Sequence, residues 1–261
     1  MSFIELSDGR VWYDEAGSGE PVVLLHGGAV DSRFFDAMLP GLVQRFRVIR
    51  TDLWGHGRTA DRPGPFSLDS FAADVAELIE RVAGGAADVV GHSIGANVAL
   101  ALAMSRPDLV RRTVQISGGF NVEADVAAVG ERPPIDEMVA STVAFLGASY
   151  GEVSPDGQAH FAVVVRKDFE LSSREPALRT EDLREVRIRT LVMAADDDIT
   201  PLEHMLDMYR ALPDAELAIV PGTSHFLLQE KPELCNSVII DFLANEPVAT
   251  VAPIKRSRGG G

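Results

Sequence analysis

The sequence predicts an α/β protein, with a doubly wound and mostly parallel sheet that carries helices on both faces. From residue 22 onward, short apolar runs of strand length alternate with longer segments of helical periodicity. The first of these runs, residues 22–25, is apolar throughout, which is typical of strands buried on both faces. Alternation of this kind builds parallel strands joined by right-handed crossovers.

The individual elements follow from local signals. An opening hairpin is expected around the turn Asp8-Gly9, because the flanking residues alternate between apolar and polar. Residues 67–82 repeat apolar side chains at helical spacing and carry acids on the opposite face. The remaining strands are predicted at 47–52, 87–90, 112–117, 190–195 and 216–220, and the remaining helices at 32–46, 96–105, 202–212 and 232–243.

The alternation is interrupted once, between Gly118 and residue 187. This segment contains Pro133-Pro134 and two helical stretches, 135–146 and 158–168, and it is too short for a core of its own. The prediction is therefore a core, a small helical cap insertion and a disordered tail. The core comprises residues 1–117 and 188–245, the cap 118–187 and the tail 246–261.

Composition excludes several classes of partner. The 261 residues carry 24 basic and 39 acidic side chains, a net charge of −15, so nucleic acid and anionic membrane surfaces are poor partners. The single cysteine, Cys235, forms no internal disulfide, and no Cys/His cluster suggests a metal site. No signal peptide and no run of membrane-spanning length is evident, so a cytoplasmic protein is expected. The oligomeric state is left open.

The chemistry is organised around Gly91-His92-Ser93-Ile94-Gly95. A β-branched run enters this Gly-x-Ser-x-Gly turn and an Ala/Leu-rich helix leaves it, which is the context of a nucleophile elbow. The two glycines allow strand and helix to approach closely while the serine takes a strained conformation. Ser93 is thus predicted to be a nucleophile beside the positive end of a helix.

A serine nucleophile needs a base and a carboxylate that orients the base. Both residue types follow late strands: Asp196-Asp197-Asp198 comes just past the strand at 190–195, and His225 comes just past the strand at 216–220. Loops after parallel strands share one edge of the sheet, so Ser93, His225 and one of the three aspartates can converge there.

Together, these features resemble the α/β-hydrolase fold family over roughly residues 11–243. The order of serine, aspartate and histidine is that of the family. His26-Gly27-Gly28 is similar to its oxyanion loop, and Gly222-Thr223-Ser224-His225-Phe226 to its histidine loop. The segment from Asp52 to Thr59 is similar to its Asp-x-x-Gly-His-Gly-x-Ser/Thr motif.

The resemblance implies specific roles. The family's Gly-x-x-Asp acid loop, with Ala195 in the glycine position, selects Asp198, although Asp196 and Asp197 remain alternatives. The backbone N–H groups of Gly28 and Ile94 would form the oxyanion hole. His26 and His56 would be structural, and His92 is expected to pack away from the substrate.

The expected function is a carboxylesterase-like serine hydrolase that needs no cofactor and cleaves a small-molecule ester, thioester or lactone through an acyl-enzyme. Two alternatives use the same triad: hydrolysis of a C–C bond in a ring-fission product, and cofactor-free perhydrolysis. A third, of another class, is a hydrolase-fold protein that binds a ligand without turnover.

Overall fold

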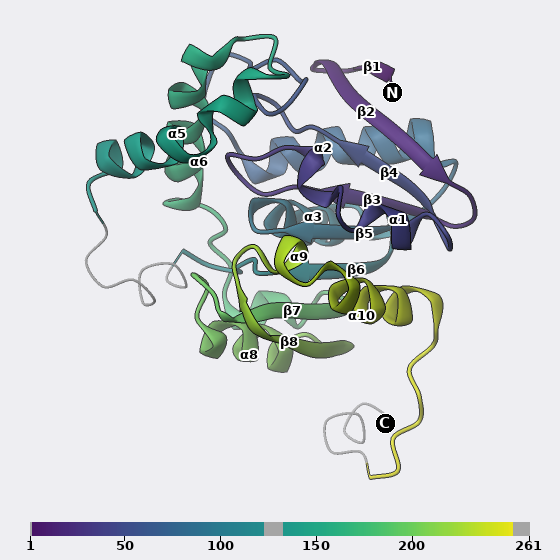
Figure 1. The fold of residues 1–261 in the computed structure, drawn as a ribbon. Coiled ribbons are helices and arrows are strands. Elements are labelled where there is room, and N and C mark those ends of the chain that lie inside the picture. The colour runs from purple at the N-terminus through teal and green to yellow at the C-terminus, as the bar shows by residue number, and fades with distance from the viewer. Residues whose placement is uncertain (1, 123–132, 253–261) are drawn as a thin grey trace.

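A computed structural model describes residues 2–122 and 133–252 (Figure 1). Within these residues, eight strands form one sheet in the order β1-β2-β4-β3-β5-β6-β7-β8. The pairs β1–β2 and β2–β4 are antiparallel, and all other neighbours are parallel. The strands are β1 (Ser2–Leu6), β2 (Gly9–Gly17), β3 (Pro21–Leu25), β4 (Arg47–Thr51), β5 (Ala87–His92), β6 (Val110–Ile116), β7 (Arg189–Asp197) and β8 (Ala215–Ser224).

Helices cover both faces of the sheet, as the alternation predicts. Strand β3 shows why: Val22 and Leu24 face one apolar cluster and Val23 and Leu25 face another. Helices α2 (Leu68–Leu78), α3 (Ile94–Ser105) and α8 (Leu202–Ala211) cover one face. On the opposite face lie α1 (Leu39–Leu42), α9 (Leu227–Glu230) and α10 (Pro232–Ala244).

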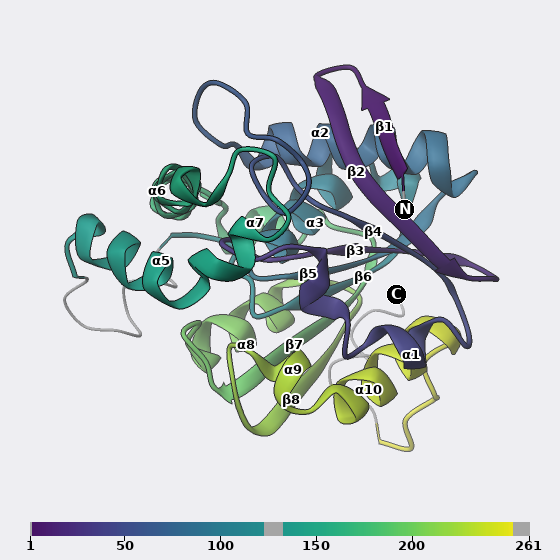
Figure 2. The same cartoon turned by 45° about the horizontal axis from the view of Figure 1, so that its top comes forward.

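Further helices lie between β6 and β7. These are α5 (Ile135–Gly151), η4 (Gln158–His160), α6 (Phe161–Ser172) and α7 (Thr180–Leu183). In Figure 2, α5 and α6 lie beside one end of the sheet rather than over one of its faces. They lie within the predicted cap, 118–187, and from here on the word cap refers to its residues 133–187. Short helical turns elsewhere are η1 (Ser32–Phe35), η2 (Ile79–Ala83) and η3 (Pro107–Leu109).

One predicted element is wrong and others change length. The continuous helix expected over 32–46 is split into η1 and α1, because Pro40 has no N–H to continue a helix and fits only a first turn. Strand β7 extends through Asp197, so the first two aspartates lie within the strand and not after it. The reason is additional pairing with β8, where Asp197 faces Ser224 after a shift of register.

Two further predictions concern the end of the chain and membranes. Residues 246–252 form neither helix nor strand, and the rest of the predicted disordered tail, 253–261, lies outside the described residues. None of the helices described combines the length and apolarity needed to cross a bilayer.

Candidate active site

Ser93 occupies a sharp turn between β5 and α3. Its φ of 54° and ψ of −121° place it in a conformation that non-glycine residues rarely adopt. The turn is tight on both sides: a side chain at Gly91 would collide with the backbone of Gly95, and one at Gly95 would collide with the backbone of Leu25. The pattern of glycines is therefore required by the close approach of strand and helix, as the sequence indicates.

His225 and Asp198 form a hydrogen-bonded pair at the same edge of the sheet. His225 Nδ1 lies 2.7 Å from Asp198 Oδ1, and the exposed fractions of the two side chains are 15% and 0%. Asp198 Oδ2 accepts a hydrogen bond of 2.5 Å from Ser117 Oγ. Burial alone would raise the pKa of Asp198, but the hydrogen bond and charge of His225, with Ser117, lower it overall. Asp198 is therefore an ionised acceptor for His225.

The other two aspartates have different surroundings. Asp196 Oδ1 accepts a hydrogen bond of 3.1 Å from the backbone N–H of Thr223, and both Asp196 and Asp197 are exposed. The geometry thus brings Asp198, and not its neighbours, to His225. The register shift between Ala195 and Asp197 lies immediately before Asp198, where a bulge changes the direction of following side chains.

The predicted oxyanion donors lie together beside Ser93. Ile94 is the first residue of α3, so its N–H has no acceptor within the helix. Gly28 lies close to it: a Cβ on Gly28 would be 2.7 Å from Ile94 Cδ1. Gly28, Ile94, Ser93 and His225 all line one cavity of about 500 Å³.

The cavity is mainly apolar and carries acidic groups. The cap contributes apolar side chains from α5 and α6, among them Met138, Leu146 and Phe169. Asp168 and Glu175 also line it, whereas no lysine or arginine does so among its described lining residues. Within residues 2–122 and 133–252, no three His, Cys, Asp or Glu side chains are grouped as metal ligands.

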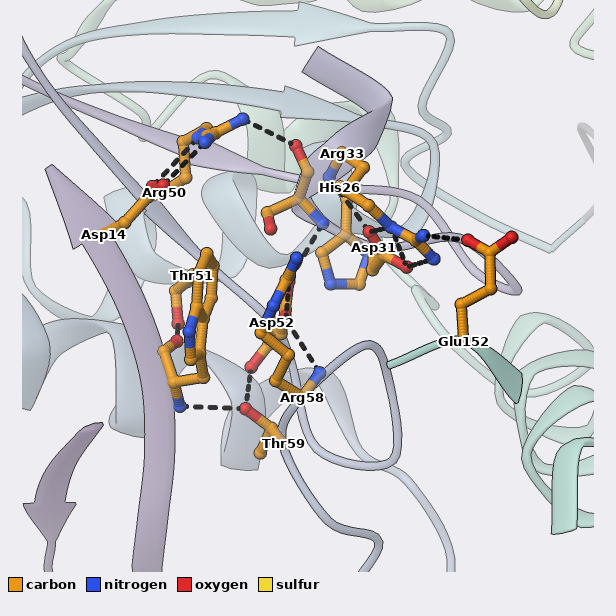
Figure 3. Close-up of polar contacts among 12 residues, drawn as sticks. Asp14, His26, Asp31, Arg33, Arg50, Thr51, Asp52, Arg58, Thr59 and Glu152 are labelled. Atoms are coloured by element: carbon orange, nitrogen blue, oxygen red, sulfur yellow. Dashed lines mark hydrogen bonds and ion pairs between the residues drawn. The ribbon is translucent and has the colours of Figure 1, made fainter. Parts of the chain in front are cut away.

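The Asp52 motif is a structural support behind this site (Figure 3). Asp52 accepts hydrogen bonds from the backbone N–H groups of Ser32 at 2.9 Å and Arg58 at 2.8 Å. Thr59 Oγ1 donates to the carbonyl of Asp52 at 2.7 Å. His26 Nε2 accepts from the N–H of Leu53 at 3.0 Å. These bonds tie the loops after β3 and β4 to each other.

Sequence reasoning missed two residues of the site. Ser117 directly follows β6 at the same sheet edge, and its position as the last residue of the strand predicted at 112–117 is a usable signal. Asp168, on α6, gave no such signal because its place depends on how the cap docks. His92 packs against Phe34 as expected, with ring centroids 4.5 Å apart, but it also contacts the backbone of His225.

The sequence profile of the alpha/beta hydrolase family matches residues 22–238, which include every residue of this site. The chain belongs to the alpha/beta hydrolase family. As an alpha/beta hydrolase with a serine at the elbow, it shares the mostly parallel sheet and flanking helices of that family.

Other alpha/beta hydrolases resemble it along nearly their whole length. A non-heme haloperoxidase of Rhodococcus erythropolis is 28% identical over 93% of this chain and 99% of the relative. The 2-(acetamidomethylene)succinate hydrolase of Mesorhizobium japonicum is 26% identical over 88% and 90%. The crystal structure of a hydrolase from Pseudomonas aeruginosa PA01 superposes with a TM-score of 0.73 at 25% identity, covering 94% of this chain and 98% of that one.

Proposed function

We propose that this protein is a carboxylesterase-like serine hydrolase that cleaves an uncharged small-molecule ester, thioester or lactone, with Ser93 as nucleophile, His225 as base and Asp198 as the orienting acid. One observation carries the proposal. A serine in a strained elbow and a histidine paired with a buried carboxylate open into one cavity. These are the groups that acyl transfer requires.

The chemistry proceeds in two steps. His225 accepts the Ser93 proton as the hydroxyl attacks the carbonyl carbon, and then returns it to the leaving alcohol, thiol or ring oxygen. Water, deprotonated by His225, next attacks the acyl-enzyme, releasing the acid and restoring the serine. Asp198 accepts the Nδ1–H of His225 at 2.7 Å, which fixes the tautomer with Nε2 free to take the proton.

The backbone N–H groups of Gly28 and Ile94 serve as the oxyanion hole in this proposal. Negative charge develops on the carbonyl oxygen during each attack, and donors fixed beforehand stabilise it. Loss of one such donor slows catalysis by about 10²-fold to 10³-fold. The positive end of α3, which begins at Ile94, adds to the favourable potential.

The charges of the cavity support an uncharged substrate. Glu175 lines it, and no lysine or arginine among its described lining residues would pair with a substrate carboxylate. The relative from M. japonicum is named for a succinate, which carries carboxylates. We therefore do not propose that substrate for this chain. The same holds for other anionic acids, such as ring-fission products that carry a carboxylate.

The test compares hydrolysis of p-nitrophenyl acetate, butyrate and octanoate by the wild type, Ser93→Ala and Ser105→Ala. Ser105 lies at the exposed end of the same helix, and its hydroxyl donates to the carbonyl of Ala101. Ser93→Ala should lose about 10³-fold or more in kcat/KM, while Ser105→Ala should match the wild type. Activity that survives in Ser93→Ala, or a wild type without hydrolysis, would reject the proposal.

A further inference from the structure

We propose that Asp168, on the cap helix α6, is a positioning residue that holds the oxyanion loop, residues 26–29, in its reactive conformation. The inference rests on the proposed function, because it concerns the same Ser93 site. It makes the cap part of the catalytic machinery: the oxyanion hole is complete only when α6 is docked against the core.

The backbone of Ala29 is strained. The φ of Ala29 is 60°, in the left-handed region that disfavours an alanine. Such a conformation persists only when the surroundings fix it. Asp168 Oδ2 accepts a hydrogen bond from the N–H of Ala29 at 2.9 Å, although the two residues are 139 positions apart. Because the peptide unit is planar, fixing this N–H also fixes the carbonyl of Gly28, which only φ and ψ of Gly28 separate from its own N–H, the proposed oxyanion donor.

Gly28 is closely packed between the cap and the core. A Cβ built on Gly28 would lie 3.1 Å from Cγ of Asp168 and 2.7 Å from Cδ1 of Ile94. The loop is therefore enclosed between the cap carboxylate on one side and the first residue after the nucleophile on the other. A displacement of Asp168 would therefore affect both Gly28 and Ile94, the residues of the two proposed oxyanion donors.

The negative charge of Asp168 has a partner. A lone carboxylate next to the oxyanion hole would oppose the negative charge that forms there. Asp168, only 5% exposed, is instead paired with His56, whose Nε2 lies 3.1 Å from Asp168 Oδ2. Nδ1 of His56 lies 2.9 Å from the carbonyl of Trp54, so both ring nitrogens face acceptors and both donate when the ring is protonated.

The direction of the pKa shift of His56 agrees with a protonated ring. Burial lowers it, but the charge and hydrogen bond of Asp168, together with the carbonyl of Trp54 and the charge of Asp52, raise it overall. An imidazolium beside the carboxylate gives a neutral pair. Asp168 can therefore hold Ala29 without placing a net negative charge beside the reacting carbonyl.

One oxygen of Asp168 lacks a hydrogen bond. Asp168 Oδ1 is buried and has no hydrogen-bond partner among the described residues, and an unpaired buried acceptor disfavours folding. An apolar side chain would fill the same space without that penalty. The carboxylate adds the ion pair with His56 and the bond to Ala29, and the bond to Ala29 is the one that reaches the oxyanion loop.

Amide hydrogen exchange at Ala29 tests the inference without requiring turnover. Asp168→Ala should exchange this proton at least tenfold faster than the wild type. The matched control is Asp156→Ala, which removes another bond between cap and core, from the N–H of Asp61 to Asp156 Oδ2 at 2.7 Å. Asp156→Ala should leave Ala29 unchanged. Equal exchange in Asp168→Ala and the wild type would overturn the inference even if the enzyme is a serine esterase.

Kinetics provide the second readout. With p-nitrophenyl butyrate, Asp168→Ala should lower kcat by about 10²-fold and leave KM within about threefold, as expected for a lost transition-state interaction. Binding of butylboronic acid, whose serine adduct places an anionic oxygen in the hole, should weaken by a similar factor. Asp168→Asn keeps an oxygen acceptor for Ala29 and should recover about tenfold of the lost kcat.

Two outcomes separate the inference from the proposed function. A raised KM with unchanged kcat in Asp168→Ala would show that Asp168 contacts substrate and does not position the loop. A wild type without esterase activity would reject the proposed function, while the exchange rate of Ala29 would still decide whether Asp168 fixes the loop.

Discussion

The ring of His92 donates its Nε2–H to the backbone carbonyl of His225 at 2.8 Å, across 133 positions of the chain. Burial, followed by the charge of His225, lowers the pKa of His92 to about 3, so the ring is neutral at working pH. Because His92 directly precedes Ser93, this bond joins the nucleophile turn to the loop that carries the proposed base.

Removing this bond should slow catalysis without changing binding. His92→Phe keeps a ring that stacks on Phe34, but it has no donor for His225. We expect kcat for p-nitrophenyl butyrate to fall about tenfold with KM unchanged, since about 1.4 kcal/mol corresponds to a factor of ten in rate. Steady-state kinetics measure both constants, and an unaltered kcat would show that the bond does not orient the base.

The three consecutive aspartates should differ sharply in their contribution. Asp198→Asn removes the ionised acceptor of His225, a type of change that lowers kcat by about 10⁴-fold in a serine protease triad. We expect a loss of about 10³-fold to 10⁴-fold here. Asp196→Asn and Asp197→Asn are the matched controls and should stay within twofold of the wild type, because neither contacts His225. A large loss in either control would reassign the acid.

The charge of the substrate should matter more than its length. Mono-p-nitrophenyl succinate and p-nitrophenyl butyrate share the same four-carbon acyl chain but differ by one terminal carboxylate. We predict that kcat/KM favours the butyrate ester by about tenfold or more, since Glu175 lines the cavity and its charge opposes a substrate carboxylate. Glu175→Gln should reduce the difference in kcat/KM between the two esters. Equal rates, or a preference for the succinate ester, would contradict the proposal of an uncharged substrate.

The pair of His56 and Asp168 predicts the sign of a pH effect on stability. The pKa of His56 is raised above its ordinary 6.5 in the folded chain, so its contribution is fully present below pH 6.5 and is lost as pH rises through the raised value. The groups that face His56 are Asp168, Asp52 and the ring of His26, whose centroid is 5.1 Å away.

Urea unfolding of the wild type and His56→Asn checks this sign. The difference in the free energy of unfolding between the two proteins should be larger at pH 6 than at pH 9. Asp69→Asn, a substitution on the surface helix α2, serves as the control and should show no such trend. A difference that grows with pH would contradict the assignment of His56 as the cation.

Local signals account for the part of the site that the sequence predicts. Five consecutive residues, 91–95, determine the strain at Ser93 and the close approach of strand and helix at Gly91 and Gly95. The order of strands places His225 at the same edge of the sheet. The choice of Asp198 over its neighbours required the family resemblance, because the register shift in β7 that separates them depends on pairing with β8.

Tertiary packing accounts for the rest. Asp168 lies in a segment without a motif, and its bonds to Ala29 and His56 exist only because α6 docks on two loops far away in the chain. The helix expected over 32–46 fails for a similar reason. Its apolar side chains reach the core as two short turns, which Pro40 permits and a continuous helix would not.

Covalent labelling of Ser93 tests the central claim most directly. A fluorophosphonate reacts with an activated serine, and peptide mapping by mass spectrometry locates the adduct. We expect one adduct on the peptide that contains Ser93, present in the wild type, absent from Ser93→Ala and much slower to form in His225→Ala. An unlabelled wild type, or an adduct on another serine, would contradict it.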